Sequence, residues 1–212
     1  MFDIEYKGGN AIVISGKKTQ VIVDPKLSVV GLKDLTGKDS VQLATEARFT
    51  TNDSEAKICI EGPGEFEVGE VSIRGVRATR HLDTEADEPI STMYRVEIGD
   101  VRIAVVGNIA AKLHEDQLEE IGIVDILVLP VGGNGYTLDS VNAAIVARQI
   151  DPRVVIPVHY DDKALKYEVP QDDVDLFVKE LAAPVENVGA KYKVKSASSI
   201  PQVLTTVLID RS

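Results

Sequence analysis

Two patterns of apolar residues follow each other along the chain, and together they limit the folds open to it. Residues 1–80 hold short strand-like runs such as AIVIS and QVIVDP, which glycine-containing turns separate. From residue 114 onward, helical patterns alternate with apolar runs such as VDILVLPV. Short apolar runs bounded by turn residues predict strands, and the runs between helices predict buried strands. The sequence therefore predicts a sheet-on-sheet core with helices outside it.

The individual elements can be placed by their start and stop signals. Strands are predicted at 2–6, 11–15, 20–25, 124–131, 153–158, within 56–80 and within 190–212, with a hairpin at 92–108 that turns at Gly99-Asp100. Helices are predicted at 114–122 with Gly122 as cap, at 138–152 with Asp139 or Ser140 as N-cap, and from near Pro170 to Pro184. Residues 31–46 are expected to hold a loop and a short helix. No repeat or linker interrupts the pattern, so we predict one domain over residues 1–212.

Composition and charge narrow the classes of partner. A chain of 212 residues with 44% hydrophobic content can bury a full core. The net charge of -11 repels phosphate backbones, so no nucleic-acid partner is expected. A single cysteine, Cys59, excludes an internal disulfide and a multi-cysteine metal cluster. The start MFDIEYKGGN does not resemble a signal peptide, and the apolar runs are too short to span a bilayer, so we expect a cytoplasmic protein without membrane contact.

The few histidines direct attention to the ends of predicted strands. His81 and His159 each follow a strand, and Asn108 follows a third. Strand ends that meet at one edge of a sheet are where ligands commonly bind, so these three side chains are candidates for a shared site. The alternative is that each histidine is a hydrogen-bonded surface residue. His114, at the start of an exposed helix, is assigned to the surface.

Four stretches together resemble the metallo-β-lactamase superfamily: AKICIEGPGEFEVGEVSIRGV, YRVEIGDVRIAVVGN, LHEDQLEEIGIVDILVLPVGGNGYTLD and DPRVVIPVHY. The resemblance covers about residues 1–162, and the branch most similar is that of small bacterial metal-dependent hydrolases related to L-ascorbate-6-phosphate lactonase. It implies an α/β fold, a four-layer αββα sandwich, which residues 163–212 complete with a helix and terminal strands. It also implies a zinc or manganese site at one edge of the two sheets, where a metal-activated hydroxide attacks an ester, lactone or phosphodiester.

The family's ligand positions can be compared with this chain one at a time. His81 and His159 match ligand histidines, and Asn108 stands where the family has an aspartate that often bridges two metals. The family signature H-x-H-x-D-H falls on residues 46–51, where its four defining positions are Glu46, Arg48, Thr50 and Thr51. No histidine occurs in residues 1–80, so no shift of the alignment restores the motif.

These replacements change what the site can hold. A two-metal centre needs several imidazoles and a carboxylate, whereas Asn108 is neutral and Arg48 is a permanent cation that cannot ligate a metal. We therefore expect no cofactor, and we predict that Arg48 replaces the charge of the metal and pairs with Glu46 or Asp83. The alternatives are a zinc ion held by His81, His159 and Glu46, and a rebuilt 44–56 loop in which Arg48 points to water.

Two further segments are assigned mainly to structure. The segment EGPGEFEVGE carries four acidic residues, Glu61, Glu65, Glu67 and Glu70, and its glycines and alternation predict a turn and a hairpin rather than catalytic carboxylates. The loop PVGGNGYTLD borders the site in the resembling family, so Gly133 and Tyr136 are expected to line a remnant pocket. The loop lacks the lysine of a phosphate-binding P-loop.

Two classes of function follow. The first is a non-catalytic binding or scaffold protein, whose partner is a protein, a small molecule or a second copy of the chain. The second is a hydrolase with a reduced metal site, acting on a small lactone, ester or phosphorylated substrate. The first class is preferred because it explains all the replaced ligands at once.

Overall fold

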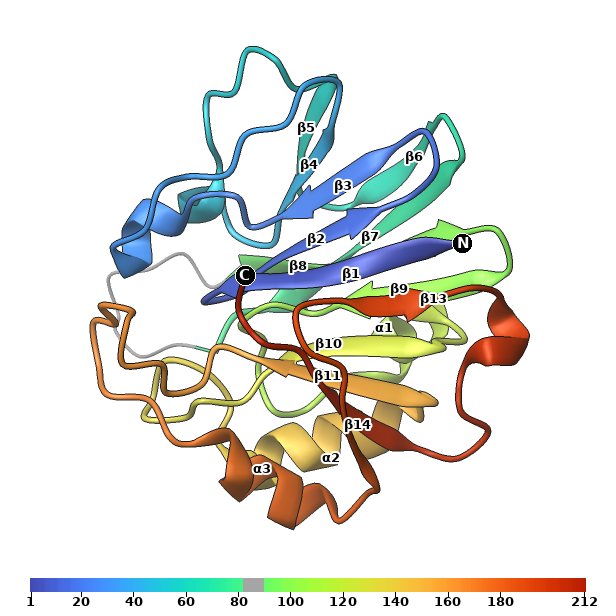
Figure 1. The fold of residues 1–212 in the computed structure, drawn as a ribbon. Helices are drawn as coiled ribbons and strands as arrows, with labels where there is room; N and C mark the ends of the chain where they lie inside the picture. The colour runs from blue at the N-terminus through green and yellow to red at the C-terminus, as the bar shows by residue number, and fades with distance from the viewer. Residues whose placement is uncertain (82–89) are drawn as a thin grey trace.

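Two β-sheets form the centre of the computed structural model, which describes residues 1–81 and 90–212 (Figure 1). The six-stranded sheet has the order β13-β1-β2-β3-β4-β5, and the eight-stranded sheet has the order β12-β14-β11-β10-β9-β8-β7-β6. The strands of the first sheet are β1 Phe2–Gly8, β2 Ala11–Ser15, β3 Gln20–Val23, β4 Val41–Ala44, β5 Ile58–Glu61 and β13 Tyr192–Val194. Those of the second are β6 Gly64–Val68, β7 Val71–Thr79, β8 Ile90–Ile98, β9 Val101–Val105, β10 Ile126–Pro130, β11 Val154–Val158, β12 Val185–Asn187 and β14 Thr205–Leu208.

Most strands lie where the sequence predicts them, but β4 and β12 do not. Strand β4 occupies part of the segment 31–46 that was expected to form a loop and a short helix. All four residues of β4 are buried, and the strand pairs in parallel with β3 and β5. This sheet pairing outweighs the weak local signal. The nearby 3-10 turn, η1, lies earlier in the chain, at Leu27–Val30.

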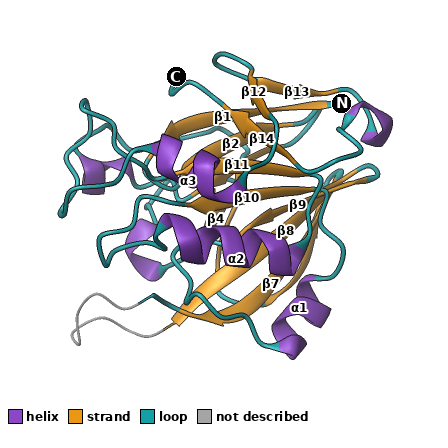
Figure 2. Cartoon of the chain, turned by 90° about the horizontal axis from the view of Figure 1, so that it is seen from below, coloured by secondary structure: helices purple, strands orange, loops and turns teal. Residues whose placement is uncertain are grey.

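The three α-helices lie on the outer side of the eight-stranded sheet, as Figure 2 shows. Helix α1, Glu115–Ile121, ends at Gly122 as predicted, and helix α2, Ser140–Ile150, begins after the N-cap Asp139. Helix α3, Val174–Leu181, begins later than the predicted start near Pro170, because the side chain of Asp173 accepts a hydrogen bond from the nitrogen of Asp175 and caps the helix there. No helix of the described residues is long and apolar enough to cross a membrane.

The predicted class is confirmed, with a different outer layer on one side. Among the described residues, the six-stranded sheet is covered by loops and 3-10 turns rather than by α-helices. The loop at Gly37 lies so close to this sheet that a Cβ atom there would be 2.9 Å from Cδ1 of Ile22. Residues 163–212 contribute strands to both sheets, because β13 pairs with β1 while β12 and β14 extend the second sheet.

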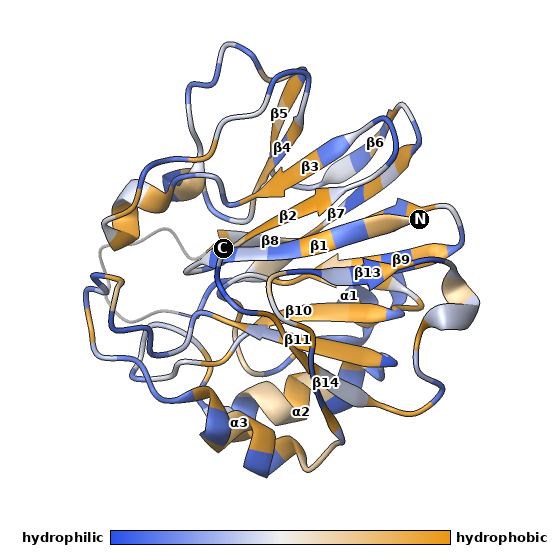
Figure 3. Ribbon diagram, viewed as in Figure 1, coloured by the Kyte–Doolittle hydropathy of each residue, from blue (hydrophilic) through white to orange (hydrophobic). Residues whose placement is uncertain are grey.

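The main hydrophobic core lies between the two sheets. Apolar residues dominate the central strands, as the orange segments of β10 and β11 show in Figure 3. Side chains such as Ile4, Ile14, Val96 and Ile126 are fully buried in this core. A second cluster packs the outer face of the eight-stranded sheet against α2 and α3, with Phe177 at its centre. The two clusters hold the strand ends in fixed positions, and those ends carry the polar residues described next.

Candidate functional site

Polar side chains that directly follow five strands converge in the folded chain. Asp24 follows β3, Glu46 lies two residues after β4, Arg80 follows β7, Asn108 lies three residues after β9, and His159 follows β11. All five are buried, with only small exposed fractions. A convergence of buried, charged and neutral polar groups at strand ends marks a candidate functional site in a fold of this kind.

Glu46 is the centre of this cluster. Its Oε2 atom lies 2.7 Å from Nε of Arg80 and 3.1 Å from Nε of Arg48, and its Oε1 atom accepts a hydrogen bond of 2.8 Å from Nδ2 of Asn108. The exposed fraction is 5% for the Glu46 side chain and 2% for that of Arg80. Two guanidinium groups and an amide therefore satisfy one buried carboxylate.

A chain of hydrogen bonds connects Asn108 to His159. Nδ2 of Asn10 lies 3.4 Å from Oδ1 of Asn108, and Oδ1 of Asn10 lies 2.7 Å from Nδ1 of His159. Because the amide oxygen can only accept, Nδ1 carries the proton and Nε2 of His159 is left with a lone pair. Nε2 is buried and has no hydrogen-bond partner among the described residues. Burial, together with the nearby charge of Arg48, lowers the pKa of His159 from 6.5 to about 3, so the imidazole is neutral near pH 7.

Aromatic rings close the site on the side of Arg48. The Cζ atom of Arg48 lies 4.6 Å from the ring centre of Tyr136 and 4.9 Å from that of Phe49. The ring of His159 packs against two tyrosine rings. Its centroid lies 5.1 Å from that of Tyr136 and 4.9 Å from that of Tyr167. Two voids of about 10 Å³ each adjoin His159 in the described part of the chain, and each has room for roughly one water molecule. Tyr136 lines both voids as expected of a pocket residue, whereas Gly133 lines neither and forms a turn with Thr137.

Asp24 supports the segment that carries Glu46. Its two carboxylate oxygens accept hydrogen bonds of 2.7 Å from the nitrogen of Thr45 and 2.8 Å from its Oγ1. Burial raises the pKa of Asp24 from 3.8 to about 7, the hydrogen bonds from Thr45 oppose this, and the charge of Glu46 adds to it. Asp24 and His159 both have a positive φ, of 50° and 53°, a conformation that non-glycine residues adopt at a cost.

Not all residues of the predicted site join the cluster. Thr50 Oγ1 donates to the carbonyl of Ala47 within the 3-10 turn η2, Ala47–Phe49, and Thr51 Oγ1 donates to Oε1 of Gln42 on β4. His81 is half-buried and its backbone nitrogen donates to the carbonyl of Asn108 at 3.1 Å, which places it beside the cluster. Asp83 lies outside the described residues.

The predicted ion pair between Arg48 and Glu46 is present, and the guanidinium of Arg48 lies against the rings of Phe49 and Tyr136 instead of pointing to water. Arg80, Asn10 and Asp24 were missed by sequence analysis. The signal used for Asn108, a polar residue just after an apolar strand, also applies to Asp24 in VIVDP and to Arg80 in VRATR.

A zinc or manganese ion in a protein requires several ligand side chains that converge on one point. In residues 1–81 and 90–212, no group of three or more histidine, cysteine, aspartate or glutamate side chains is arranged to hold a metal. The carboxylate of Glu46 is already paired with two guanidinium groups. The described residues of the cluster therefore do not fit a zinc or manganese centre.

Comparison with known proteins identifies the superfamily. A family model described as a β-lactamase superfamily domain matches residues 3–159. A UPF0173 metal-dependent hydrolase of Natranaerobius thermophilus is 28% identical over 123 residues, covering 58% of this chain and 51% of that protein. A UPF0173 metal-dependent hydrolase of Symbiobacterium thermophilum is 41% identical over 69 residues, covering 31% of this chain and 30% of that protein. The chain thus spans about half the length, or less, of these two curated relatives.

Solved structures agree on the fold. A candidate Zn-dependent hydrolase of the metallo-β-lactamase superfamily from Thermotoga maritima has a TM-score of 0.77 at 24% identity, with 99% of each chain covered. The metallo-β-lactamase fold protein YhfI of Bacillus subtilis has a TM-score of 0.57 at 10% identity, covering 100% of this chain and 98% of that one. The narrower similarity to the lactonase branch stays a prediction. The family match and the shared fold together establish that the chain belongs to the β-lactamase superfamily and has the metallo-β-lactamase fold.

Proposed function

We propose that this chain is a non-catalytic member of the superfamily, a binding or scaffold protein in which arginine side chains take over the structural role of a metal centre. One observation carries the proposal: the buried carboxylate of Glu46 is bound by the guanidinium groups of both Arg48 and Arg80. Guanidinium groups stay protonated at any physiological pH, so they supply positive charge without any cofactor.

The charges around Glu46 favour this reading over an empty metal site. A divalent ion placed next to Glu46 would lie within a few ångströms of two cations, where the repulsion is large at low dielectric. Asn108, in the place of the bridging aspartate, donates to Glu46 through Nδ2, so its amide nitrogen faces the carboxylate. That two cations and an amide already bind the carboxylate of Glu46 supports a cluster that needs no metal.

The closure of the site supports a non-catalytic role. Arg48 lies against Tyr136 and Phe49, and the voids beside His159 have only about 10 Å³ each. Sites that bind small molecules usually have several hundred cubic ångströms. A partner, whether a protein or a small molecule, is therefore proposed to bind elsewhere on the surface, and the protein is proposed to act in the cytoplasm.

The melting temperature measured with and without added metal tests this proposal. A metal that binds only the folded state at a concentration of 100 Kd stabilises it by about 2.7 kcal/mol, which corresponds to a shift of several degrees. We expect no shift with zinc or manganese, and none with a chelator on freshly purified protein. A saturable increase with either metal, lost on chelation, would overturn the proposal.

A second function is favoured by one specific observation, the neutral and unshared Nε2 atom of His159. A neutral imidazole with a free lone pair is the form that binds zinc. The alternative of a reduced site of His81, His159 and Glu46, in a hydrolase acting on a lactone, an ester or a phosphorylated compound, requires these side chains to move together, because no such group of the described residues is arranged to hold a metal. This candidate requires stoichiometric zinc and an activity that His159→Asn abolishes, and the absence of both would exclude it.

A further inference from the structure

Strand β5 forms an open edge of the six-stranded sheet. Among the residues that the structure describes, it is the last strand of this sheet and pairs only with β4, in parallel (Figure 1). Just after the strand, a Cβ atom added at Gly62 would meet nothing within 4 Å. An open edge strand presents backbone N–H and C=O groups that can pair with another strand.

The sequence of this edge is symmetric about Cys59. Residues 57–61 read Lys-Ile-Cys-Ile-Glu, with one isoleucine on each side of the cysteine and opposite charges at the two ends. Lys57, Cys59 and Glu61 are exposed. Ile60 is buried in the core between the sheets, and Ile58 is partly buried against it. The strand therefore has a polar face with a central thiol and an apolar face with two isoleucines.

The two charges at the ends of this edge have no partner within the described residues. Neither Lys57 nor Glu61 forms an ion pair there. The backbone nitrogen of Lys57 donates to the carbonyl of Ser40 at 2.8 Å, so Lys57 directs its N–H group toward β4. Because backbone groups alternate along a strand, Cys59 also points its N–H group toward β4, whereas Ile58 and Ile60 point theirs to the open edge.

We propose that β5 pairs with β5 of a second copy of this chain, in antiparallel fashion and centred on Cys59. A two-fold axis at this point sets Lys57 opposite Glu61 of the second copy, and Ile58 opposite Ile60 of the second copy. Each of these contacts occurs twice, and no like charges within residues 57–61 lie opposite each other. The two six-stranded sheets then form one continuous sheet, which covers the partly exposed side of Ile58.

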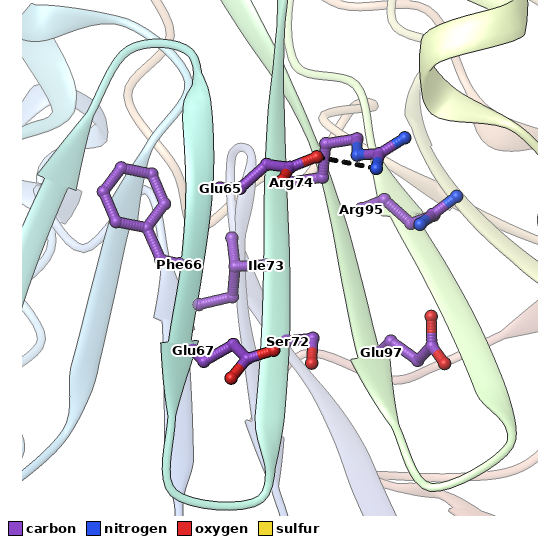
Figure 4. A pocket seen from close by; sticks show the side chains of 8 residues that line it. All are labelled: Glu65, Phe66, Glu67, Ser72, Ile73, Arg74, Arg95 and Glu97. Atoms are coloured by element: carbon purple, nitrogen blue, oxygen red, sulfur yellow. Dashed lines mark ion pairs between the residues drawn. The ribbon is translucent and has the colours of Figure 1, made fainter.

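The other edge strands in the described part of the chain lack this symmetry. Pairing of two β6 strands about their centre sets Glu65 opposite Glu67, which lie on the same face of the sheet (Figure 4). The same operation sets Glu186 of β12 opposite itself, and Lys193 of β13 opposite itself. Like charges directly opposite each other destabilise a pair of strands. The pattern of charges therefore favours β5 over β6, β12 and β13.

The net charge of each copy sets the conditions for this pairing. The charge of -11 opposes association in general. At 0.15 M salt, repulsion beyond about 8 Å is largely screened, while directly facing ion pairs are screened less. We therefore expect the pairing at physiological ionic strength.

Sedimentation equilibrium in 0.15 M salt tests the proposal with charge-reversal variants. We expect the wild-type chain to dimerise, and we expect Lys57→Glu and Glu61→Lys each to weaken the dimer by at least about tenfold, because each reversal sets two pairs of like charges opposite each other. An equimolar mixture of these two variants restores opposite charges at both ends and should form heterodimers. The double variant Lys57→Glu/Glu61→Lys should dimerise again for the same reason.

Oxidation tests the position of the axis. Across an antiparallel pair of this type the two Cys59 Cα atoms lie about 4.5 Å apart, which a disulfide can bridge. The thiol oxidant diamide should convert the two Cys59 thiols into one disulfide between the chains, while the azo group of diamide takes up the two electrons and two protons. A gel run without reductant measures the linked fraction. The control Cys59→Ser/Ser72→Cys moves the single cysteine to an exposed position on β7 and should be linked much more slowly.

A matched control separates the effect of position from that of net charge. Lys193→Glu makes the same charge change as Lys57→Glu at the opposite edge of the same sheet, and it should leave the dimer unchanged. Circular dichroism checks that each variant is folded. A wild-type chain that stays monomeric, single variants that dimerise as well as wild type, or equally fast linking through position 72 would overturn the proposal. None of these outcomes depends on bound metal, so they are distinguishable from a failure of the proposed function.

Discussion

The Nε atom of Arg48 lies 3.1 Å from Oε2 of Glu46, and we propose that these two residues stand in place of the two leading histidines of the family signature. The pair is more than an exposed salt bridge, because the Glu46 side chain is only 5% exposed. A buried carboxylate must be balanced, and here cationic side chains balance it. The following predictions concern this balance.

Replacing Arg48 by alanine should destabilise the protein. The change removes one cation from Glu46 and the stacking on Tyr136 and Phe49, while Arg80 and Asn108 remain. We expect a loss of about 1–3 kcal/mol in the free energy of unfolding, measured in urea. Arg48→Lys keeps the charge without the planar stacking group and should lose less. Unchanged stability in Arg48→Ala would show that Arg48 does not support the cluster.

Neutralising Glu46 should lower the free energy of unfolding by more than the replacement of Arg48 does. Glu46→Gln leaves the guanidinium of Arg80, with a side chain only 2% exposed, beside a neutral amide. The expected loss is about 3–5 kcal/mol. The matched control is Glu65→Gln, which breaks the ion pair with Arg74 at a side chain that is 74% exposed and should change stability by less than about 1 kcal/mol. Similar effects of the two variants would contradict the central position of Glu46.

Restoring the family's aspartate at position 108 distinguishes the two functional readings. Asn108→Asp replaces a donor that lies 2.8 Å from Oε1 of Glu46 by a second carboxylate. Like charges at this distance should destabilise the protein by about 2–3 kcal/mol at pH 7. We expect zinc not to restore the melting temperature. Rescue by stoichiometric zinc would instead support the reduced metal site.

Two buried titrating groups should give opposite dependences of stability on pH. The pKa of Asp24 is raised from 3.8 to about 7, so the folded state holds this proton more tightly than the unfolded state does. Protonated Asp24 therefore stabilises the folded state fully below pH 4, and this stabilisation is lost as the pH rises to 7. The pKa of His159 is lowered from 6.5 to about 3. Its contribution to the free energy of unfolding is therefore present above pH 6.5 and is lost as the pH falls to 3. Each slope is about 1.4 kcal/mol per pH unit, so they oppose each other between pH 4 and 6.5.

Single variants should separate these slopes in urea titrations at several pH values. Asp24→Asn leaves the contribution of His159, so stability should rise with pH between 4 and 6.5 more steeply than in wild type. His159→Asn leaves the contribution of Asp24, so stability should fall with pH across 4 to 7. Asparagine tolerates the positive φ at both positions. Identical pH profiles in the two variants would exclude this assignment.

The strands were predictable because their apolar runs and glycine turns are local signals. The sheet-on-sheet core and the α1 cap at Gly122 followed from the same reasoning, whereas the four-layer αββα class was what the family resemblance implied. Strand β4 was not predictable, because VQLA is held by pairing with β3 and β5 rather than by its own sequence. The start of α3 depends on a single cap at Asp173, and sequence patterns place such boundaries poorly.

The centre of the site was predicted only in part. The pair of Arg48 and Glu46 is two residues apart in sequence, so it could be proposed without knowing the fold. Arg80 and Asn10 reach the cluster from β7 and from the turn between β1 and β2, which requires both sheets to be packed. The closure by Tyr136 and Tyr167 around His159 depends on two loops, whose course no local pattern fixes.

We propose that this member of the superfamily folds without a bound metal, because arginine side chains take over its structural role. The most direct test is elemental analysis of protein purified without a histidine tag from cells grown with added zinc and manganese. We expect far less than one metal ion per chain, for wild type as for His159→Asn. One zinc or manganese ion per wild-type chain, lost in His159→Asn, would contradict it.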